Sequence, residues 1–258
     1  MVNVGAPFAM TNQVALVTGA SGAIGSQLVL ELARRGAAIV AIDILDGTDV
    51  VTSITEGDGE GISVVADLRD EEATTRAVDE ALGWRGRIDV LVNMAGIYYG
   101  VPRVPFWEIS GDTWDDMIGS NMRTTFLACK AVSVPMRAAG RGRIVNVSSN
   151  VSVFGMSNFM HYAAAKAALV GMTRSMAREL GPFGVAVNAV APGLVNTTRS
   201  QGELAPEYLQ AVVNGQCLRS PIEVSDVVHA VAFLSSDESR LITGQTLLIN
   251  GGAAMGSF

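Results

Sequence analysis

The chain has 258 residues, of which 49% are hydrophobic and only 17% charged, so it fits one large α/β domain with a sizeable core. Its formal net charge is −7 and it contains no run of Lys or Arg, which argues against nucleic acid or a membrane as the main partner and favours a small molecule. Two cysteines in unrelated contexts and two histidines form no Cys/His cluster, so we expect no metal ion and a reducing, cytoplasmic setting.

The N-terminal residues carry no sign of a targeting segment. The first ten lack a basic region followed by an apolar stretch, and no apolar run in the chain reaches the roughly 18 residues that span a bilayer. We therefore expect a soluble protein with a flexible extension over residues 1–10, followed by a single domain over residues 11–258.

A glycine-rich turn is the first candidate site. An apolar run over residues 13–18 leads into GASGAIG at residues 19–25, and residues 26–35 then show helical periodicity. In such a unit the backbone can approach a pyrophosphate, which the free N–H groups of the helix N-terminus attract. A turn without a ligand is the alternative, and the spacing differs from GxGxxG. The cofactor contacts predicted in this turn are Gly19, Ser21, Gly22, Ala23, Ile24 and Gly25.

The next strand indicates which dinucleotide is bound. This apolar strand, over residues 37–42, ends at Asp43, and the following residue is Ile44 rather than an arginine. An acidic residue roughly 20 positions beyond the glycines can accept hydrogen bonds from the ribose hydroxyls of NAD and would repel the 2′-phosphate of NADP. We therefore predict NAD as the cofactor.

The rest of the chain continues the alternation of strands and helices. Further strands are expected over residues 62–66, 88–92, 144–147, 185–190 and 246–249, and helices over 71–82, 112–139, 159–180 and 224–235. This pattern predicts an α/β fold, a doubly wound Rossmann-type parallel sheet of about seven strands with helices on both faces. Ligands of such sheets bind beyond the carboxyl ends of the strands. The residues expected at those ends are Asp67, Leu68, Asn93, Ala95 and Gly96.

Tyr162 and Lys166 form a candidate acid/base pair. They are four residues apart in an alanine-rich helical segment, so their side chains leave the same face. A nearby ammonium favours the ionised form of a phenol, whose ordinary pKa is about 10, and brings it closer to acid/base work at neutral pH. An ordinary surface helix can carry the same two residues, so the assignment depends on other residues converging on the pair.

Several motifs, in order along the chain, resemble the short-chain dehydrogenase/reductase family over about residues 11–253. They are Thr18-Gly19, Asn93-Met94-Ala95-Gly96, the helical Asn121, Ser149 thirteen residues before Tyr162, Lys166, Pro192-Gly193 and TGQTLLINGG at residues 243–252. The resemblance is to the shorter, single-domain branch. It implies a dinucleotide-binding catalytic domain over residues 11–258, a substrate loop over about 194–220, and a homotetramer.

The resemblance also implies roles for individual residues. Tyr162 would exchange a proton with the substrate oxygen while the nicotinamide gives or takes a hydride, and Ser149 would hydrogen-bond the same oxygen. Lys166 would hold the nicotinamide ribose and lower the pKa of Tyr162, and Asn121 would fix a water. Ser148 is the rival of Ser149, but adjacent strand residues face opposite sides and the spacing favours Ser149. The further cofactor contacts implied are Tyr162, Lys166, Pro192, Gly193, Val195 and Thr197.

One departure from the family pattern lies in the glycine-rich turn. Ala23 stands where the shorter members usually have glycine, and Gly22 completes the TGxxGxxG spacing of the extended branch, which includes sugar-nucleotide epimerases and dehydratases. The extended branch carries a C-terminal substrate domain, for which few residues remain after residue 252. We expect the added methyl group to leave dinucleotide binding intact.

The predicted substrate pocket is mostly apolar and aromatic, which suits a hydrophobic secondary alcohol or ketone. Its expected lining is Ile97, Tyr98, Tyr99, Phe106, Trp107, Val151, Val153, Phe154, Met156 and the segment 196–220. Arg103 or Arg199 can alternatively bind a carboxylate, whereas His161 is expected to be a packing or interface residue. Two other functions stay open: sugar-nucleotide epimerase or dehydratase chemistry, and a non-enzymatic NAD-binding sensor.

Overall fold

Seven parallel strands form the central sheet of the computed structural model, in the order β3-β2-β1-β4-β5-β6-β9. The strands are β1 (Val14–Thr18), β2 (Ala38–Asp43), β3 (Gly61–Val65), β4 (Val90–Asn93), β5 (Gly142–Val147), β6 (Val185–Pro192) and β9 (Thr246–Ile249). β1 pairs with β2 on one side and with β4 on the other, so the strand order reverses there. This confirms the predicted doubly wound α/β fold and places its ligand crevice at the carboxyl ends of the strands.

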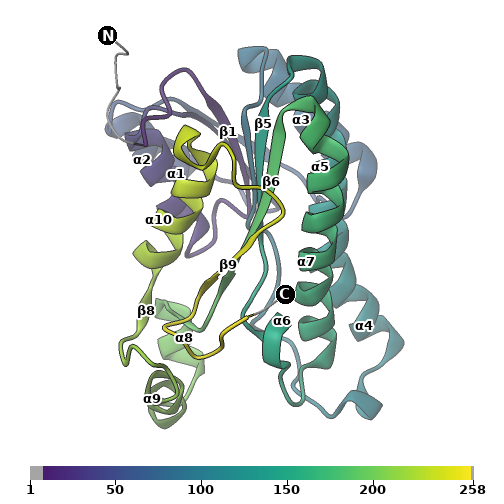
Figure 1. Cartoon of the computed structure of the whole chain (residues 1–258), viewed down its shortest axis with the longest axis vertical. Coiled ribbons are helices and arrows are strands. Elements are labelled where there is room, and N and C mark those ends of the chain that lie inside the picture. Colours follow the sequence, from purple (N-terminus) through teal and green to yellow (C-terminus); the bar gives the residue numbers. More distant parts are fainter. Residues whose placement is uncertain (1–7, 257–258) are drawn as a thin grey trace.

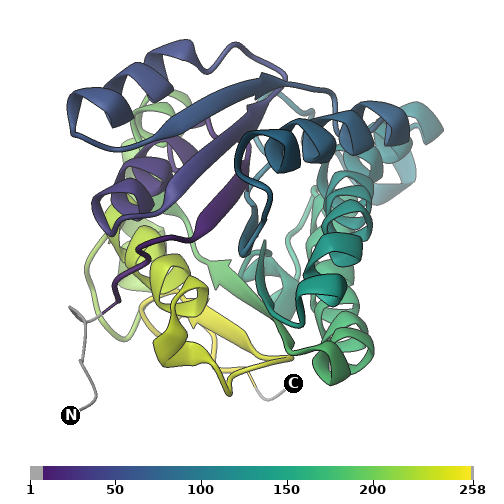
Figure 2. The same ribbon diagram turned by 90° about the horizontal axis from the view of Figure 1, so that it is seen from above.

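Helices cover both faces of this sheet (Figure 1, Figure 2). On one face lie α1 (Gly25–Arg34), α2 (Thr48–Glu56) and α10 (Val224–Ser235). On the other lie α3 (Glu71–Arg85), α5 (Thr124–Ala139) and α7 (Met160–Leu180). Each face buries its own apolar cluster, which includes Leu28, Leu32 and Val231 on the first and Leu91, Val132 and Met136 on the second. Burial on both sides explains why the strands are almost continuously apolar.

Shorter elements connect the long helices and strands. They are α4 (Gly111–Ile118), the π-helical segment η2 (Gly119–Arg123), α6 (Val151–Phe154), β7 (Val195–Asn196), α8 (Thr198–Glu203), α9 (Pro206–Asn214), β8 (Ile222–Glu223) and the 3₁₀ turns η1 (Phe106–Glu108), η3 (Gly181–Phe183) and η4 (Asp237–Ser239). The predicted helix over 112–139 is therefore interrupted by a π-helical turn. The segment 194–220, predicted as a loop, contains two helices instead. Among the shorter elements, α6, β7 and α8 follow the carboxyl ends of β5 and β6.

Local signals explain where the helices begin and end. α3 starts after Asp70, whose carboxylate accepts a hydrogen bond from the Ala73 N–H (2.6 Å), and it ends at Gly86, which has φ +68°. α8 is held by a reciprocal cap in which Thr197 and Ser200 each accept from the other's backbone N–H. α9 begins with Pro206 in its first turn. Such caps stabilise short helices inside a stretch whose composition is typical of a loop.

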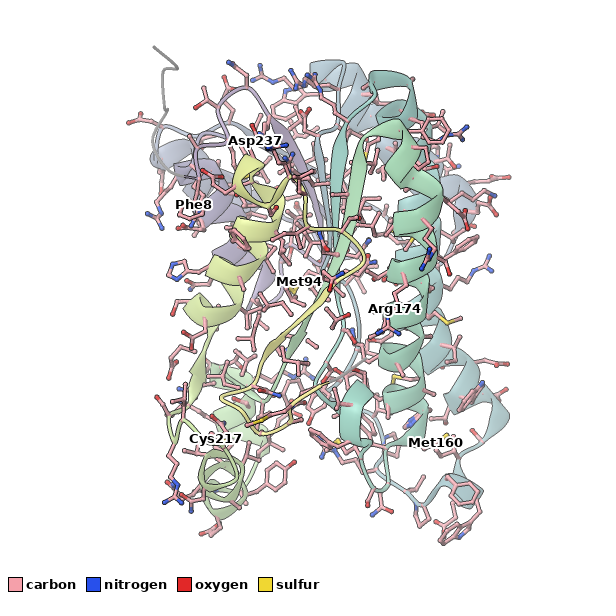
Figure 3. All side chains as sticks on the ribbon, in the orientation of Figure 1. Phe8, Met94, Met160, Arg174, Cys217 and Asp237 are labelled. Carbon is pink, nitrogen blue, oxygen red and sulfur yellow. The ribbon has the colours of Figure 1, made fainter. Side chains whose placement is uncertain are left out.

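The structure describes residues 8–256, so most of the predicted extension over residues 1–10 lies outside the described residues. The part inside is not a loose tail. Met10 is fully buried, and its N–H donates to the Arg35 carbonyl at 2.8 Å. Phe8 packs edge-on against Phe233 of α10 with ring centroids 6.2 Å apart (Figure 3). Phe8 and Met10 are therefore packed against the domain, and the flexibility of the extension stays a prediction. Within the same residues no helix combines the length and apolar character that crossing a bilayer requires.

Candidate active site

A cleft of about 1230 Å³ lies at the carboxyl ends of the strands. It brings together residues from the glycine-rich turn, from the ends of β2, β3, β4, β5 and β6, and from α7 and α8. The predicted site residues that line it are Gly19, Ser21, Gly22, Ala23, Ile24, Gly25, Asp43, Asp67, Leu68, Ala95, Gly96, Asn121, Ser149, Tyr162, Lys166, Pro192, Gly193, Val195 and Thr197. Residues spread over most of the chain thus share one cavity.

Asn93 is the one predicted site residue outside this lining. Its side-chain amide donates to Asn146 Oδ1 at 2.9 Å and lies 3.2 Å from the Cys129 sulfur, and Asn146 in turn donates to Thr173 Oγ1 at 2.9 Å. These polar groups are buried and join β4, β5, α5 and α7. The Asn93 side chain therefore supports the sheet behind the cleft, and a contact between Asn93 and the cofactor stays a prediction.

The glycine-rich turn is tightly built. Gly19 has φ +67°, and a Cβ atom placed on Gly25 would collide with the Gly19 carbonyl oxygen, so the helix can approach the strand only with glycine there. Asp43 accepts a hydrogen bond from the Ser21 N–H at 3.0 Å, which fixes the turn to the end of β2. Ala23 is exposed on the cleft side, where its methyl group meets no such restriction.

Two features of this end of the cleft fit a dinucleotide. The Ser21 hydroxyl is buried and has no hydrogen-bond partner within residues 8–256, although it lies on the turn at the start of α1. The Asp43 carboxylate stands at the end of β2 with no arginine beside it in the chain. A hydroxyl and helix N–H groups suit phosphate oxygens, and a carboxylate suits ribose hydroxyls. The residues present therefore fit a nicotinamide dinucleotide.

The wall beside β3 carries an ion pair that the sequence analysis missed. Arg69 lies two residues after Asp67, lines the same cleft, and donates to its carboxylate at 2.8 Å. Hydrogen bonds and charge from Arg69 hold the pKa of Asp67 below its ordinary value. The spacing of opposite charges at 67 and 69 is the signal that could have indicated the pair.

Tyr162 lies at the other end of the cleft, within a cluster of aromatic rings. Its own ring is stacked on Phe159 (centroids 5.1 Å apart, 25° between planes) and meets the edge of Tyr98 at 5.1 Å. Tyr162 is 7% exposed, Lys166 5% and Ser149 8%. The ring contacts leave little of the Tyr162 side chain exposed, although the residue lines the cleft.

Ser149 and Lys166 converge on Tyr162. The Ser149 side chain interacts with the phenol, whereas the Ser148 hydroxyl donates to the Lys166 carbonyl at 2.7 Å and is occupied by that bond. The Lys166 ammonium lies 5.7 Å from the centre of the Tyr162 ring and donates to the Val147 carbonyl at 3.0 Å. The structure thus brings together the three side chains that the sequence placed in one set, and it favours Ser149 over Ser148.

Burial governs the pKa values of this pair. It raises the pKa of Tyr162 well above the ordinary value near 10, while the Ser149 side chain acts in the opposite direction and the neighbouring Tyr98 raises the pKa further. Burial also lowers the pKa of Lys166 to about 8. Desolvation is thus the largest influence on the pKa of Tyr162 in this structure, and the lowering by Lys166 that the family resemblance implies stays a prediction.

Asn121 is placed by the π-helical turn η2. Its side-chain N–H groups donate to the Ile97 and Met117 carbonyls, both at 3.2 Å. Its Oδ1 atom is buried without a partner within the described residues and faces Gly96, where any Cβ atom would collide with it. π-helical turns of this kind are frequent at functional sites. Asn121 thus presents an unpaired acceptor beside the Lys166 end of the cleft.

The substrate end of the cleft is aromatic and apolar, as predicted, but its lining differs in part. Tyr98, Tyr99, Phe154 and Met156 line it, together with Leu194, Tyr208 and Val212. Phe106 and Trp107 do not. Their rings contact each other with centroids 5.1 Å apart and are 60% and 72% exposed, so their assignment to the pocket is wrong. Val153 is also outside the lining. Apolar residues after a strand end can face either the pocket or the surface, and periodicity does not decide between them.

Two of the remaining predictions concern side chains beside the pocket. His161 is fully buried, meets Phe159 edge-on at 5.1 Å and does not line the cleft, which fits a packing role. Arg103 lies over the rings of Tyr98 and Phe159, at 5.1 and 5.0 Å, and is also outside the lining. Of the two arginines considered for a carboxylate, only Arg199 reaches the cleft.

Comparison with known proteins agrees with this architecture. A family model described as enoyl-(acyl carrier protein) reductase matches residues 19–254. The chain is 35% identical to the probable galactose dehydrogenase GalD of Rhizobium meliloti (strain 1021), over 92% of this chain and 93% of that protein. It is also 35% identical to cyclopentanol dehydrogenase of Comamonas sp. (strain NCIMB 9872), over 94% of this chain and 97% of that protein.

A solved structure shows the same likeness in three dimensions. The short-chain type dehydrogenase/reductase from Mycobacterium ulcerans superposes with a TM-score of 0.89 at 26% identity, covering 95% of this chain and 90% of that one. The family model, the sequence relatives and this shared fold all lead to the same assignment. The chain belongs to the short-chain dehydrogenase/reductase family of oxidoreductases.

Proposed function

We propose that the protein is an NAD-dependent alcohol dehydrogenase or carbonyl reductase that acts on a hydrophobic secondary alcohol or its ketone, with Tyr162 as general acid/base. The observation that carries this proposal is the convergence of Ser149 and Lys166 on the Tyr162 phenol in the cavity that the glycine-rich turn also lines. The aromatic and apolar lining beyond Tyr162 suits a hydrophobic substrate. A relative at 35% identity is named cyclopentanol dehydrogenase, which is consistent with such a substrate.

The side chains divide the work around one substrate oxygen. Tyr162 gives its proton to that oxygen when a ketone is reduced and takes it back when an alcohol is oxidised. Ser149 donates a hydrogen bond to the same oxygen, where negative charge develops, and a prearranged donor in a water-poor cleft is effective at this task. The raised pKa of Tyr162 keeps its phenol protonated at neutral pH. The site therefore favours ketone reduction near neutrality and alcohol oxidation in alkali.

The dinucleotide would be held by residues that line the same cleft, from the glycine-rich turn to Lys166. When bound, it supplies or accepts the hydride. The glycine-rich turn and the Ser21 hydroxyl would bind its phosphates, Asp43 the adenosine ribose, and Lys166 the nicotinamide ribose. Asp43 supports NAD over NADP, because a carboxylate at this position repels a 2′-phosphate.

The test compares wild type with Tyr162→Phe in the reduction of cyclopentanone and related ketones. The rate is measured from the decrease in NADH absorbance. We expect the variant to lose about 100-fold or more in kcat, the typical size of a general acid/base contribution. Quenching of protein fluorescence by NADH should show that the variant still binds the cofactor. Turnover by Tyr162→Phe at the wild-type rate would contradict the mechanism.

A further inference from the structure

Arg199 is the cationic side chain at the substrate end of the cleft. Among the described residues, the cleft lining contains three cationic side chains, Arg69, Lys166 and Arg199. Arg69 is paired with Asp67 beside β3, and Lys166 donates to a backbone carbonyl next to Tyr162. The positive charge that faces the apolar substrate end, beyond Tyr162, therefore comes from Arg199.

The guanidinium of Arg199 is held in place but has an unused edge. Its Nε donates to Glu203 Oε1 at 2.7 Å, and its central carbon lies 4.9 Å from the centre of the Tyr99 ring. Its two terminal nitrogens find no acceptor in the part of the chain that the structure describes. A guanidinium presents its donors as rigid forks that match a carboxylate, so this arrangement leaves one fork for a ligand.

Stabilisation of α8 does not explain this arginine. It lies in the first turn of the helix, where the helix dipole disfavours a cation. Arg199 precedes Glu203 by four residues, which is the weaker order for an ion pair along a helix. Both side chains are about half exposed, and exposed pairs contribute little to stability. The position instead directs a positive charge into the cleft.

Contacts between aromatic rings link this charge to the tyrosine that carries the proton. The Tyr162 and Tyr98 ring centres are 5.1 Å apart, those of Tyr98 and Tyr99 are 4.8 Å apart, and Arg199 lies 4.9 Å from the last ring. Arg199 contacts the Tyr99 ring, whereas the Tyr162 ring meets that of Tyr98, so an anion bound by Arg199 would lie beside Tyr99. The carboxylate of a 2-oxo acid, which is bonded directly to the reacting carbon, would remain near Tyr162. A ring or short chain between the two groups would span the gap.

We propose that Arg199 binds a carboxylate that the substrate carries at the end remote from its carbinol carbon. The substrate class is then a hydrophobic hydroxy acid or oxo acid in which an apolar ring or chain separates the two groups. This inference rests on the proposed function and narrows it. Arg199 Nε continues to donate to Glu203, and the two terminal nitrogens of the guanidinium donate to the substrate carboxylate. Repulsion between the Glu203 carboxylate and the substrate carboxylate limits the affinity for the substrate.

The kinetic test compares an acid with its neutral analogue, 4-oxocyclohexanecarboxylate with 4-oxocyclohexanecarboxamide. The measured quantity is the ratio of their kcat/KM values in wild type and variants. Arg199→Gln should lower this ratio about 10- to 100-fold, chiefly through KM for the acid, since a hydrogen bond to a charged group is lost. Glu203→Gln should raise it several-fold by removing the competing carboxylate. Arg219→Gln, a change of an exposed arginine in the same segment outside the cleft lining, should leave the ratio unaltered.

A binding measurement separates this inference from the proposed function. Calorimetric titration with cyclohexanecarboxylate and cyclohexanecarboxamide needs no turnover, and Arg199→Gln should weaken binding of the acid about 10-fold or more relative to the amide. If wild type reduces either ketone but Arg199→Gln leaves the acid-to-amide ratios of kcat/KM and of affinity unaltered, the carboxylate site is overturned and the oxidoreductase assignment stands. If neither ketone is reduced, the calorimetric ratio alone decides whether Arg199 binds carboxylates.

Discussion

Replacing Lys166 by methionine should make the protein more stable at neutral pH while it abolishes activity. Lys166 is 5% exposed, and its ammonium is held by a single carbonyl, that of Val147. Among the described residues no carboxylate forms an ion pair with it. A buried charge without a counter-charge costs folding free energy, and methionine fills a similar volume without that charge. Activity should be lost because the variant lacks the ammonium that we propose to bind the nicotinamide ribose beside Tyr162.

The lowered pKa gives the size of the effect. Burial takes the pKa of Lys166 from 10.5 to about 8, and at 1.36 kcal/mol per pKa unit the buried charge costs about 3 kcal/mol. Below pH 8 the lysine is charged in both the folded and unfolded chains, so the whole cost is present. Between pH 8 and 10.5 the unfolded chain binds the extra proton, so the stability of the wild type rises with pH in that window. The advantage of the methionine variant shrinks over the same window.

The assay is urea unfolding at pH 7 and pH 9.5, at one fixed protein concentration. At pH 7, Lys166→Met should unfold at a higher urea concentration than wild type, and its free energy of unfolding should be larger by about 3 kcal/mol. At pH 9.5 this difference in the free energy of unfolding should be clearly smaller. The matched control is Lys130→Met, which changes the other lysine of the chain. Lys130 is exposed and paired with Glu71 at 2.5 Å, so its loss should change stability by less than about 1 kcal/mol. Two results would refute the reasoning: a Lys166→Met protein that is less stable than wild type at pH 7, or a difference in the free energy of unfolding between variant and wild type that is the same at both pH values.

Four further outcomes are expected. Asp43→Ala should narrow the preference for NAD over NADP, and an unchanged ratio of kcat/KM values would count against the ribose assignment. Gly25→Ala should lose NADH binding, measured by fluorescence, because the new Cβ atom would collide with the Gly19 carbonyl. The control is Gly83→Ala in α3, which should keep NADH binding because its Cβ atom would meet nothing within 4 Å. Alcohol oxidation should rise with pH beyond 10, since burial raises the pKa of Tyr162, and a flat profile would contradict a titrating base. We propose a homotetramer, and sedimentation of a monomer at micromolar concentration would refute it.

The fold was predictable because its signals are local. Most of the strands are short apolar runs, as in VALVT at Val14–Thr18, and polar residues or glycines such as Gly19, Asp43 and Asn93 lie at or just after their ends. The spacing of Ser149, Tyr162 and Lys166 was equally readable, because a helix fixes two of them and a strand end fixes the third. The structure placed all three in one cleft with the glycine-rich turn.

What the sequence left undetermined depends on contacts between distant elements. The π-helical turn around Asn121 contains Gly119, Ser120 and Asn121, which are weak helix formers, but this composition does not specify a π-helical turn rather than a regular helix or a loop. The helix α8 lies in a polar stretch and is held by the reciprocal cap of Thr197 and Ser200, which becomes visible only when both hydroxyls are placed. Phe106 and Trp107 look like pocket residues in sequence, but a loop carries them to the surface.

The pKa of Tyr162 shows how tertiary packing can reverse a reading from sequence spacing. The helical spacing of Tyr162 and Lys166 suggests only attraction between an ammonium and a phenolate, which would lower the pKa of the phenol. Tyr98 follows β4, far from Tyr162 in the sequence, and Phe159 caps the start of α7; both rings contact the Tyr162 ring, and the burial of the phenol raises its pKa. Burial also lowers the pKa of Lys166, to about 8. Burial thus acts on both partners of the pair, and spacing along a helix does not reveal it.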